Sequence, residues 1–297
     1  MKIVILILSS NTYPSKRNKK AIQKTWANQN YPNTDIYFYS AGTKTKIIDR
    51  DLIIKDSGTA QDIGKKTLSA FDWVDKNREY DFIFRTNTSS YVEVNNLVEY
   101  IENIPQNTDY IYKGIVQERE YENVSKNYKF VSGAGVLLNK NTVKAVLQSQ
   151  NLWDHSEWDD IALGKLLNSL NIKPQTGKRD EVKDNFYNSD IDITNYHVRC
   201  RLDQVAGYPR FFEALVIKDL HKIYYQKKPF AKNLKKYVFY VFKIFYIEKP
   251  VWRIYNSIFK ALKSTLPQSS YKILRNFKSK KLYKFILKYY QEEKKES

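Results

Sequence analysis

The sequence of 297 residues has only one cysteine, Cys200, and no long apolar run. A single thiol cannot form an intramolecular disulfide, so the composition favours a cytoplasmic location. The nearest approach to a membrane span is Tyr237–Ile247, which is about 11 residues long against the roughly 18 needed, and Lys243 interrupts it. We therefore expect no bilayer crossing. The apolar run Ile3–Leu8 is shorter than the core of a secretory signal, and we interpret it as a buried first strand.

Motifs for several common chemistries are also missing. The sequence contains neither G-x-G-x-x-G nor a Walker A motif, which argues against a dinucleotide oxidoreductase and a P-loop ATPase. His155 and His221 do not have the spacing of zinc ligands, and Cys200 has no partner thiol. No serine, histidine and acid order supports a hydrolytic triad.

Positive charge is abundant and unevenly distributed. The net charge is +18, and residues 227–297 hold 19 Lys and Arg against 4 acidic residues, so +15 lies there. An apolar fraction of 42% suits one α/β core with an appended segment. We predict a catalytic domain at residues 1–225 and a basic, aromatic-rich helical tail at 226–297.

Within residues 1–225, β-branched and aromatic runs alternate with helix-period stretches, which predicts an α/β sheet with crossover helices. The expected strands are Ile3–Leu8, Asp35–Tyr39, Leu52–Ile54, Phe82–Arg85, Tyr110–Ile115 and Gly133–Leu138. The expected helices are Lys16–Ala27, Gln61–Lys76, Glu93–Ile104, Lys140–Gln148 and Trp158–Leu170. Ser9 and Ser10 follow the first strand, where an open α/β sheet binds nucleotides.

Five short segments stand out, in this order: Lys19–Trp26; Asp56-Ser57 with Asp62–Thr67; Tyr80–Val92; Phe130–Leu138; and Asp159–Gly164. Alone, each has an ordinary structural explanation. The first segment, for example, is also typical of an amphipathic helix with Ala21, Ile22 and Trp26 packed inward. Together they resemble, in order and at similar spacing, the motifs of the β-1,3-glycosyltransferases and Fringe-like enzymes.

The resemblance implies a GT-A fold, which is a Rossmann-like open mixed sheet flanked by helices. It also implies an inverting transfer of a sugar from a UDP-sugar to an acceptor hydroxyl. The second acid of the family's (E/D)-D-V motif corresponds to Asp160, our choice of general base, with Asp159 as the second choice. A structural alternative exists for this pair, because acids in the first turn of a helix favour its macrodipole.

The remaining site candidates are expected to bind the donor. His197 lies between basic residues late in the domain, where similar enzymes place a histidine near the diphosphate, although a lone histidine is more often structural. The donor-binding candidates are Ser9, Ser10, Lys19, Lys66, Arg85, Asn87, Thr88, Ser89, Gly133, Ala134, Gly135, His197 and Arg199.

One motif departs from the family pattern. Asn87-Thr88-Ser89, here called the 87–89 triplet, stands where the family has an acidic triplet that holds a divalent cation. Mg²⁺ and Mn²⁺ favour anionic oxygen ligands, whereas these side chains offer neutral oxygens. Three interpretations stay open: metal-independent transfer assisted by cationic side chains, a weak metal site using Ser89 and His197, or an inactive protein that binds a sugar nucleotide or glycan.

The basic tail at residues 226–297 suggests that the protein has a membrane surface as a partner. Between Pro250 and Pro267, and again near the end, apolar residues recur at three- and four-residue steps among lysines, which predicts basic amphipathic helices. Such helices bind an anionic membrane surface, and this would suit an enzyme acting on a lipid-linked acceptor at the inner face of the cell membrane. They could instead pack on the catalytic domain.

The predicted function is a glycosyltransferase, and the composition, which is rich in Lys, Asn, Ile and Tyr, suits a microbial enzyme of surface polysaccharide synthesis. Nucleic-acid binding is the alternative from another class, because clustered lysines with aromatics also suit phosphate and base contacts. No helix-turn-helix, zinc or RNP motif supports it, so no nucleic-acid partner is expected.

Overall fold

The computed structural model describes residues 1–56, 62–105, 108–121, 124–182, 191–202, 210 and 213–226. All of them belong to the first of the two units into which the chain divides, Met1–Phe230. The basic tail predicted for residues 226–297 falls, from residue 227 onward, outside the described residues. The domain boundary and the tail helices stay predictions.

An eight-stranded mixed sheet forms the centre of the described region, in the order β3-β4-β2-β1-β5-β8-β7-β9. Strands β4, β2, β1 and β5 run parallel, while β8 is antiparallel to both β5 and β7. The strands are β1 Ile3–Leu8, β2 Thr34–Gly42, β3 Lys46–Ile48, β4 Asp51–Lys55, β5 Phe82–Asn87, β7 Tyr112–Tyr121, β8 Val124–Asn139 and β9 Gln175–Thr176. All six residues of β1 are apolar, as expected for a central parallel strand with both faces covered.

The strand order reverses next to β1. From β1 the chain moves outward to β2 and β4, and then returns to place β5 on the other side of β1. An open α/β sheet binds its ligands in the crevice beyond the carboxyl ends of the strands at such a switch point. In the register Leu8 pairs with Asn87, so Ser9 and the 87–89 triplet follow neighbouring strand ends.

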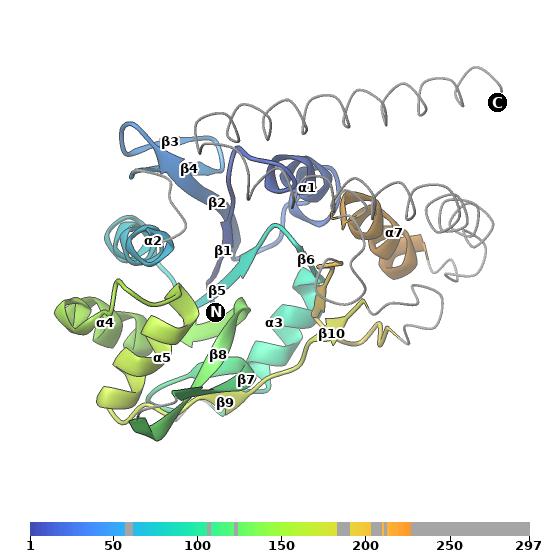
Figure 1. Cartoon of the computed structure of the whole chain (residues 1–297). Coiled ribbons are helices and arrows are strands. Elements are labelled where there is room, and N and C mark those ends of the chain that lie inside the picture. The colour runs from blue at the N-terminus through green and yellow to red at the C-terminus, as the bar shows by residue number, and fades with distance from the viewer. Residues whose placement is uncertain are drawn as a thin grey trace, which may run out of the picture. The chain divides into compact units, whose positions relative to one another are not determined.

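Helices cover both faces of this sheet (Figure 1). α2, α4 and α5 lie together on one side, and α1, α3 and α7 on the other. The helices are α1 Ser15–Gln23, α2 Ile63–Asn77, α3 Val94–Glu102, α4 Lys140–Gln148, α5 Asp159–Ser169 and α7 Glu213–Gln226, with short 3₁₀ helices at Trp26–Asn28 and Gln150–Leu152. One core cluster fills the space between the sheet and α2, α4 and α5; its buried members include Leu6, Phe71, Val143 and Leu166.

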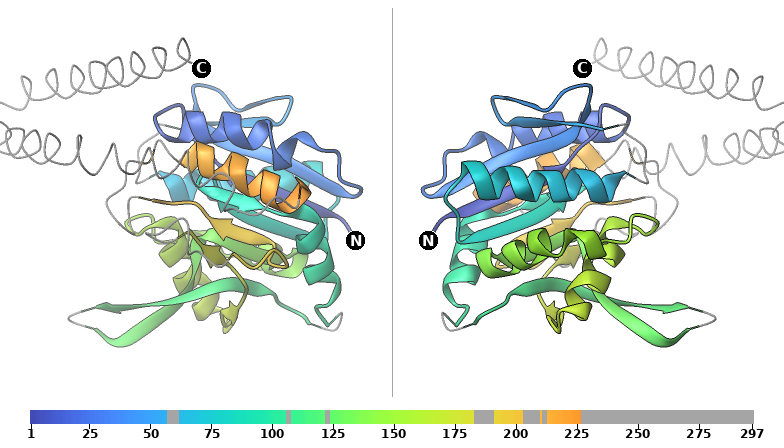
Figure 2. Two further views of the ribbon diagram at one scale, coloured as in Figure 1. Left: turned by 90° about the vertical axis from the view of Figure 1, so that its right-hand side faces the viewer. Right: turned by 90° about the vertical axis from the view of Figure 1, so that its left-hand side faces the viewer.

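Two features extend this core. β7 and β8 continue as a long hairpin that projects from the body of the domain (Figure 2). A second sheet has the order β10-β11-β6, with β6 Ser90–Val92, β10 Asp180–Glu181 and β11 His197–Arg199. β6 directly follows the 87–89 triplet, so this small sheet brings residues 197–199 beside it.

The predicted fold class, an open mixed α/β sheet flanked by helices, is confirmed. β1 and α4 have the predicted bounds, and the other predicted strands and helices exist with shifted ends. The first helix was predicted too long: α1 ends at Gln23, although Ala21, Ile22 and Trp26 are buried as expected. Among the described residues, no helix has both the length and the apolar content to cross a bilayer.

Candidate active site

The carboxyl ends of β1 and β5 place two predicted donor-binding segments side by side. Ser9 is buried, and its Oγ donates to the Tyr39 carbonyl at 3.3 Å. Ser10 is exposed, and its backbone N–H donates to Ser15 Oγ at 2.8 Å. The same Ser15 Oγ accepts a hydrogen bond from Thr88 Oγ1 at 3.0 Å. The start of α1 therefore joins the loop after β1 to the 87–89 triplet.

Arg85, on β5, is the centre of a buried polar cluster. Its guanidinium forms an ion pair with Asp159 of α5, and the exposed fractions of the two side chains are 5% and 11%. Arg85 Nε donates to Tyr39 Oη at 3.0 Å, and Nη1 donates to the Gly133 carbonyl. Thr67 Oγ1 donates to the same Asp159 carboxylate at 3.2 Å. The cluster thus joins four of the five sequence motifs.

Asp160 lies next to this ion pair but makes different contacts. Its Oδ2 accepts from the Gly133 backbone N–H at 2.9 Å, and its Oδ1 accepts from the Ile161 N–H at 3.0 Å. Burial raises the pKa of Asp160, the negative charge of Asp159 raises it further, and the Gly133 hydrogen bond opposes them. A raised pKa brings a carboxylate closer to the range in which it accepts a proton effectively.

Two glycines of the Ser-Gly-Ala-Gly segment allow these close approaches. A Cβ on Gly133 would collide with Arg85 Nη1 and lie 3.2 Å from Asp160 Oδ2. A Cβ on Gly135 would collide with the His197 ring. The intervening Ala134 offers its carbonyl to Thr86 Oγ1 at 2.7 Å. This segment therefore positions side chains from β5, α5 and β11 through its backbone.

His197 is fully enclosed beside the triplet. Its Nε2 lies 3.1 Å from Ser90 Oγ, and 1% of the residue is exposed. Burial lowers the pKa of His197 well below its usual value, and the positive charges of Arg179 and Arg199 lower it further. The imidazole is accordingly neutral near pH 7. Burial also lowers the pKa of Arg199, which pairs with Ser90 in the β11–β6 register.

The two predicted lysines have separate surroundings. Lys19 on α1 forms an ion pair with Asp51 of β4 and lies 5.0 Å from the centre of the Phe38 ring. Lys66 on α2 is 5% exposed and precedes Thr67, which contacts Asp159. Donor binding by either lysine stays a prediction.

Sequence reasoning missed two residues whose side chains contact Ser89, the third residue of the triplet. Arg210 Nη2 donates to Ser89 Oγ at 2.7 Å, and Ser89 Oγ donates to Glu213 Oε2 at 2.8 Å. Glu213 is fully buried at the start of α7. No motif marks either residue, and more than 120 residues of chain separate them from Ser89, so the sequence carried no signal for this contact.

These donors do not fit a resident divalent cation. The triplet offers neutral oxygens, the third of which is already hydrogen-bonded to a guanidinium and a carboxylate. Such metals prefer several anionic oxygen ligands. Among the described residues, no group of three or more His, Cys, Asp or Glu side chains is placed to hold a metal. Of the two metal-ligand candidates, Ser89 contacts Arg210 and His197 contacts Ser90.

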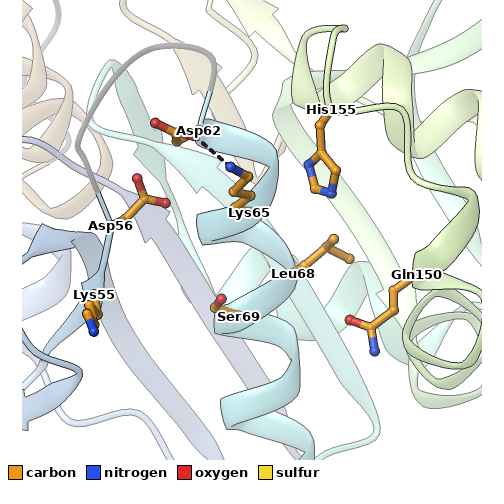
Figure 3. A pocket seen from close by; sticks show the side chains of 8 residues that line it. All are labelled: Lys55, Asp56, Asp62, Lys65, Leu68, Ser69, Gln150 and His155. Atoms are coloured by element: carbon orange, nitrogen blue, oxygen red, sulfur yellow. Dashed lines mark ion pairs between the residues drawn. The ribbon is translucent and has the colours of Figure 1, made fainter.

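An open pocket lies elsewhere, beyond β4 and beside the start of α2 (Figure 3). Its wall includes Asp56, Asp62 and Lys65, the last two joined as an ion pair at 3.2 Å, and His155 and Gln150 face them from the loop before α5. Asp56 and Asp62 belong to the second sequence motif. None of the predicted site residues lines this pocket, and we assign it no role.

The switch point between β1 and β5 thus lies near a buried Arg85–Asp159 pair and a half-buried Asp160. A family model described as Galactosyltransferase matches residues 16–178, which is more than half of the chain. The chain belongs to this galactosyltransferase family, as the motif resemblance implied, and the predicted glycosyltransferase class is confirmed at that level.

Two curated relatives are similar to the same region. The lactosylceramide 1,3-N-acetyl-beta-D-glucosaminyltransferase of Xenopus tropicalis is 24% identical over 211 residues, covering 58% of this chain and 56% of that protein. The B form of Xenopus laevis is 25% identical with the same coverage. The chain spans about half the length of the curated relatives it matches.

A solved glycosyltransferase involved in glycosylation of the major capsid of PBCV-1 is 10% identical. The structural match covers 74% of this chain and 100% of that protein, with a TM-score of 0.47.

Proposed function

We propose that this member of the galactosyltransferase family is an inverting enzyme that moves a sugar from a UDP-sugar to an acceptor hydroxyl, forming a β-1,3-like linkage. The names of the family and of the relatives support a hexosyl or N-acetylhexosaminyl donor and a glycan or glycolipid acceptor. The microbial surface polysaccharide setting rests on composition alone and stays a prediction.

Asp160 carries the proposal. It follows Asp159, which pairs with Arg85 of β5, its orientation is set by the Gly133 and Ile161 backbone N–H groups, and its pKa is raised by burial and Asp159. In the proposed reaction Asp160 takes the proton of the acceptor hydroxyl as the oxygen attacks the anomeric carbon. The bond from that carbon to the diphosphate breaks, and UDP leaves with the bonding electrons. Asp159 holds Arg85 and is a positioning residue.

Release of UDP from a panel of UDP-galactose and UDP-N-acetylhexosamines tests this role. General base catalysis contributes about 10²- to 10⁴-fold, so Asp160→Asn should lower kcat at least about 100-fold. UDP binding should be nearly unchanged. Asp72→Asn, an exposed aspartate on α2, is the matched control and should retain wild-type kcat. Near-normal turnover by Asp160→Asn would remove Asp160 from the mechanism.

The neutral 87–89 triplet favours one alternative, an inactive protein that binds a sugar nucleotide or glycan. This alternative predicts that the folded wild-type protein binds a UDP-sugar but releases no UDP in the presence of any acceptor. The same assay therefore separates an enzyme from a binding module.

The basic tail supports a further proposal from sequence, that the protein binds an anionic membrane surface peripherally at the cytoplasmic face. A lipid-linked acceptor would be available at such a surface, and the lysines of residues 227–297 would supply the attraction.

A further inference from the structure

Arg210 holds a fixed position beside the third residue of the 87–89 triplet. Its Nε donates to Glu213 Oε1 at 2.7 Å, and its Nη2 donates to Glu213 Oε2 at 3.2 Å and to Ser89 Oγ at 2.7 Å. The exposed fraction of the Arg210 side chain is 29%, whereas the Glu213 side chain is fully buried. The Arg210 side chain is therefore anchored by Glu213 and Ser89 and is partly exposed.

Glu213 is built into the domain and orients this arginine. Besides Arg210 and Ser89, its Oε2 accepts a hydrogen bond from Asn18 Nδ2 of α1 at 2.5 Å. α7, which begins at Glu213, packs against α1 and near β6 (Figure 1). A buried carboxylate with several donors has a well-defined orientation, so the position of Arg210 depends on the packing of α1 and α7.

We propose that the Arg210 guanidinium stabilises the negative charge of the diphosphate leaving group, in place of a divalent cation. The proposal rests on the proposed function. The triplet that Arg210 contacts follows the end of β5 at the switch point, where nucleotide phosphates are expected. A guanidinium is always charged, presents five donors, and matches phosphate geometry through paired hydrogen bonds.

Two other cations near this edge have different partners. Arg85 is buried against Asp159 and the Gly133 carbonyl, and Lys19 forms an ion pair with Asp51. Ser89 is 4% exposed and already hydrogen-bonded to both Arg210 and Glu213. A divalent ion at Ser89 would lie close to a positive guanidinium, with one carboxylate shared between them. Arg210 contacts Ser89 directly and is the cation that the geometry assigns to the triplet.

The test measures binding of UDP and UMP to the full chain by titration calorimetry in EDTA. Removing a charged hydrogen-bond donor should weaken UDP binding about 10- to 100-fold in Arg210→Gln. UMP binding should change much less, because it lacks the β-phosphate. Arg210→Lys keeps the charge and should retain most of the preference for UDP over UMP. The matched control is Arg78→Gln. Arg78 Nε lies 3.8 Å from Asp35 Oδ2, at the amino ends of β1 and β2 and so at the opposite edge of the sheet, and this variant should bind UDP like wild type.

Each other outcome has a defined meaning. If wild type binds UDP in EDTA and Arg210→Gln keeps the same UDP-to-UMP affinity ratio, the inference about Arg210 is wrong while the proposed function stands. Equal weakening of UDP and UMP in both the Gln and Lys variants shows a structural role and also overturns it. Wild-type binding that requires Mn²⁺ overturns the inference too. If folded wild type binds no UDP with or without Mn²⁺, the proposed function fails and the inference fails with it.

Discussion

Replacing Asp159 with asparagine should destabilise the protein strongly, because it leaves the Arg85 guanidinium buried without its anionic partner. Both side chains are nearly enclosed, with 5% and 11% exposed. Breaking a buried ion pair by removing one partner costs about 3–5 kcal/mol. Asparagine can still accept the hydrogen bond from Thr67, so we expect about 3 kcal/mol, the lower end of that range.

Thermal unfolding followed by circular dichroism measures this effect. In a domain of 150–250 residues, a loss of 1 kcal/mol lowers Tm by about 2–4 °C, so Asp159→Asn should lower Tm by about 6–12 °C. The control is Asp72→Asn, which breaks the exposed pair between Asp72 and Lys76. That pair is worth about 0.3–0.5 kcal/mol, which corresponds to a shift of about 1–2 °C.

A double variant shows whether the unpaired charge is the cause. Arg85→Met with Asp159→Asn removes both charges and should be less destabilised than the sum of the two single changes, because neither partner is left alone. A Tm for Asp159→Asn within about 2 °C of wild type would contradict the reasoning. So would strict additivity in the double variant.

Two further predictions concern His197 and the tail. Burial lowers the pKa of His197 in the folded protein below the value of about 6.5 expected in the unfolded chain. The stability that the neutral His197 ring contributes is therefore complete above about pH 6.5 and is lost as the pH falls toward the pKa of the folded protein. The Tm of wild type should thus fall more steeply below pH 6.5 than that of His197→Asn, and parallel Tm curves would refute this. In the tail, replacing Lys280, Lys281, Lys284 and Lys288 by glutamine in the full chain should reduce co-sedimentation with phosphatidylserine vesicles at least about tenfold, because each basic residue near the surface contributes about 1 kcal/mol. Replacing the exposed Lys20, Lys24, Lys44 and Lys46 should have much less effect, and equal losses would argue against the tail as the membrane-binding segment.

The sequence predicted the elements whose pattern is local. β1 is six consecutive apolar residues, and α4 is preceded by Asn139, whose side chain caps the helix by accepting from the Thr142 N–H. Short strands were missed: β6 and β11 have three residues each and exist because they pair with each other across more than 100 residues of chain. No window of sequence contains that pairing.

The candidate site, too, combines local motifs with contacts between segments that are distant in the sequence. Three of the motifs lie on β5, β8 and α5, which meet at the Arg85–Asp159 pair and the Gly133 carbonyl. Donor binding by Arg85 stays a prediction; in the structure its guanidinium contacts Asp159, Gly133 and Tyr39. The contact of Ser89 with Arg210 and Glu213 depends on the docking of α7 against α1, which is a property of the tertiary structure.

The most direct test of the account is turnover of UDP-sugars by the full-length protein in EDTA and in Mn²⁺, with UDP release measured in the presence of glycan and lipid-linked acceptors. We expect that at least one UDP-sugar is turned over, that EDTA leaves the rate nearly unchanged, and that Asp160→Asn lowers the rate at least about 100-fold. A folded protein that neither binds nor turns over any UDP-sugar in either condition would contradict the proposed glycosyltransferase activity.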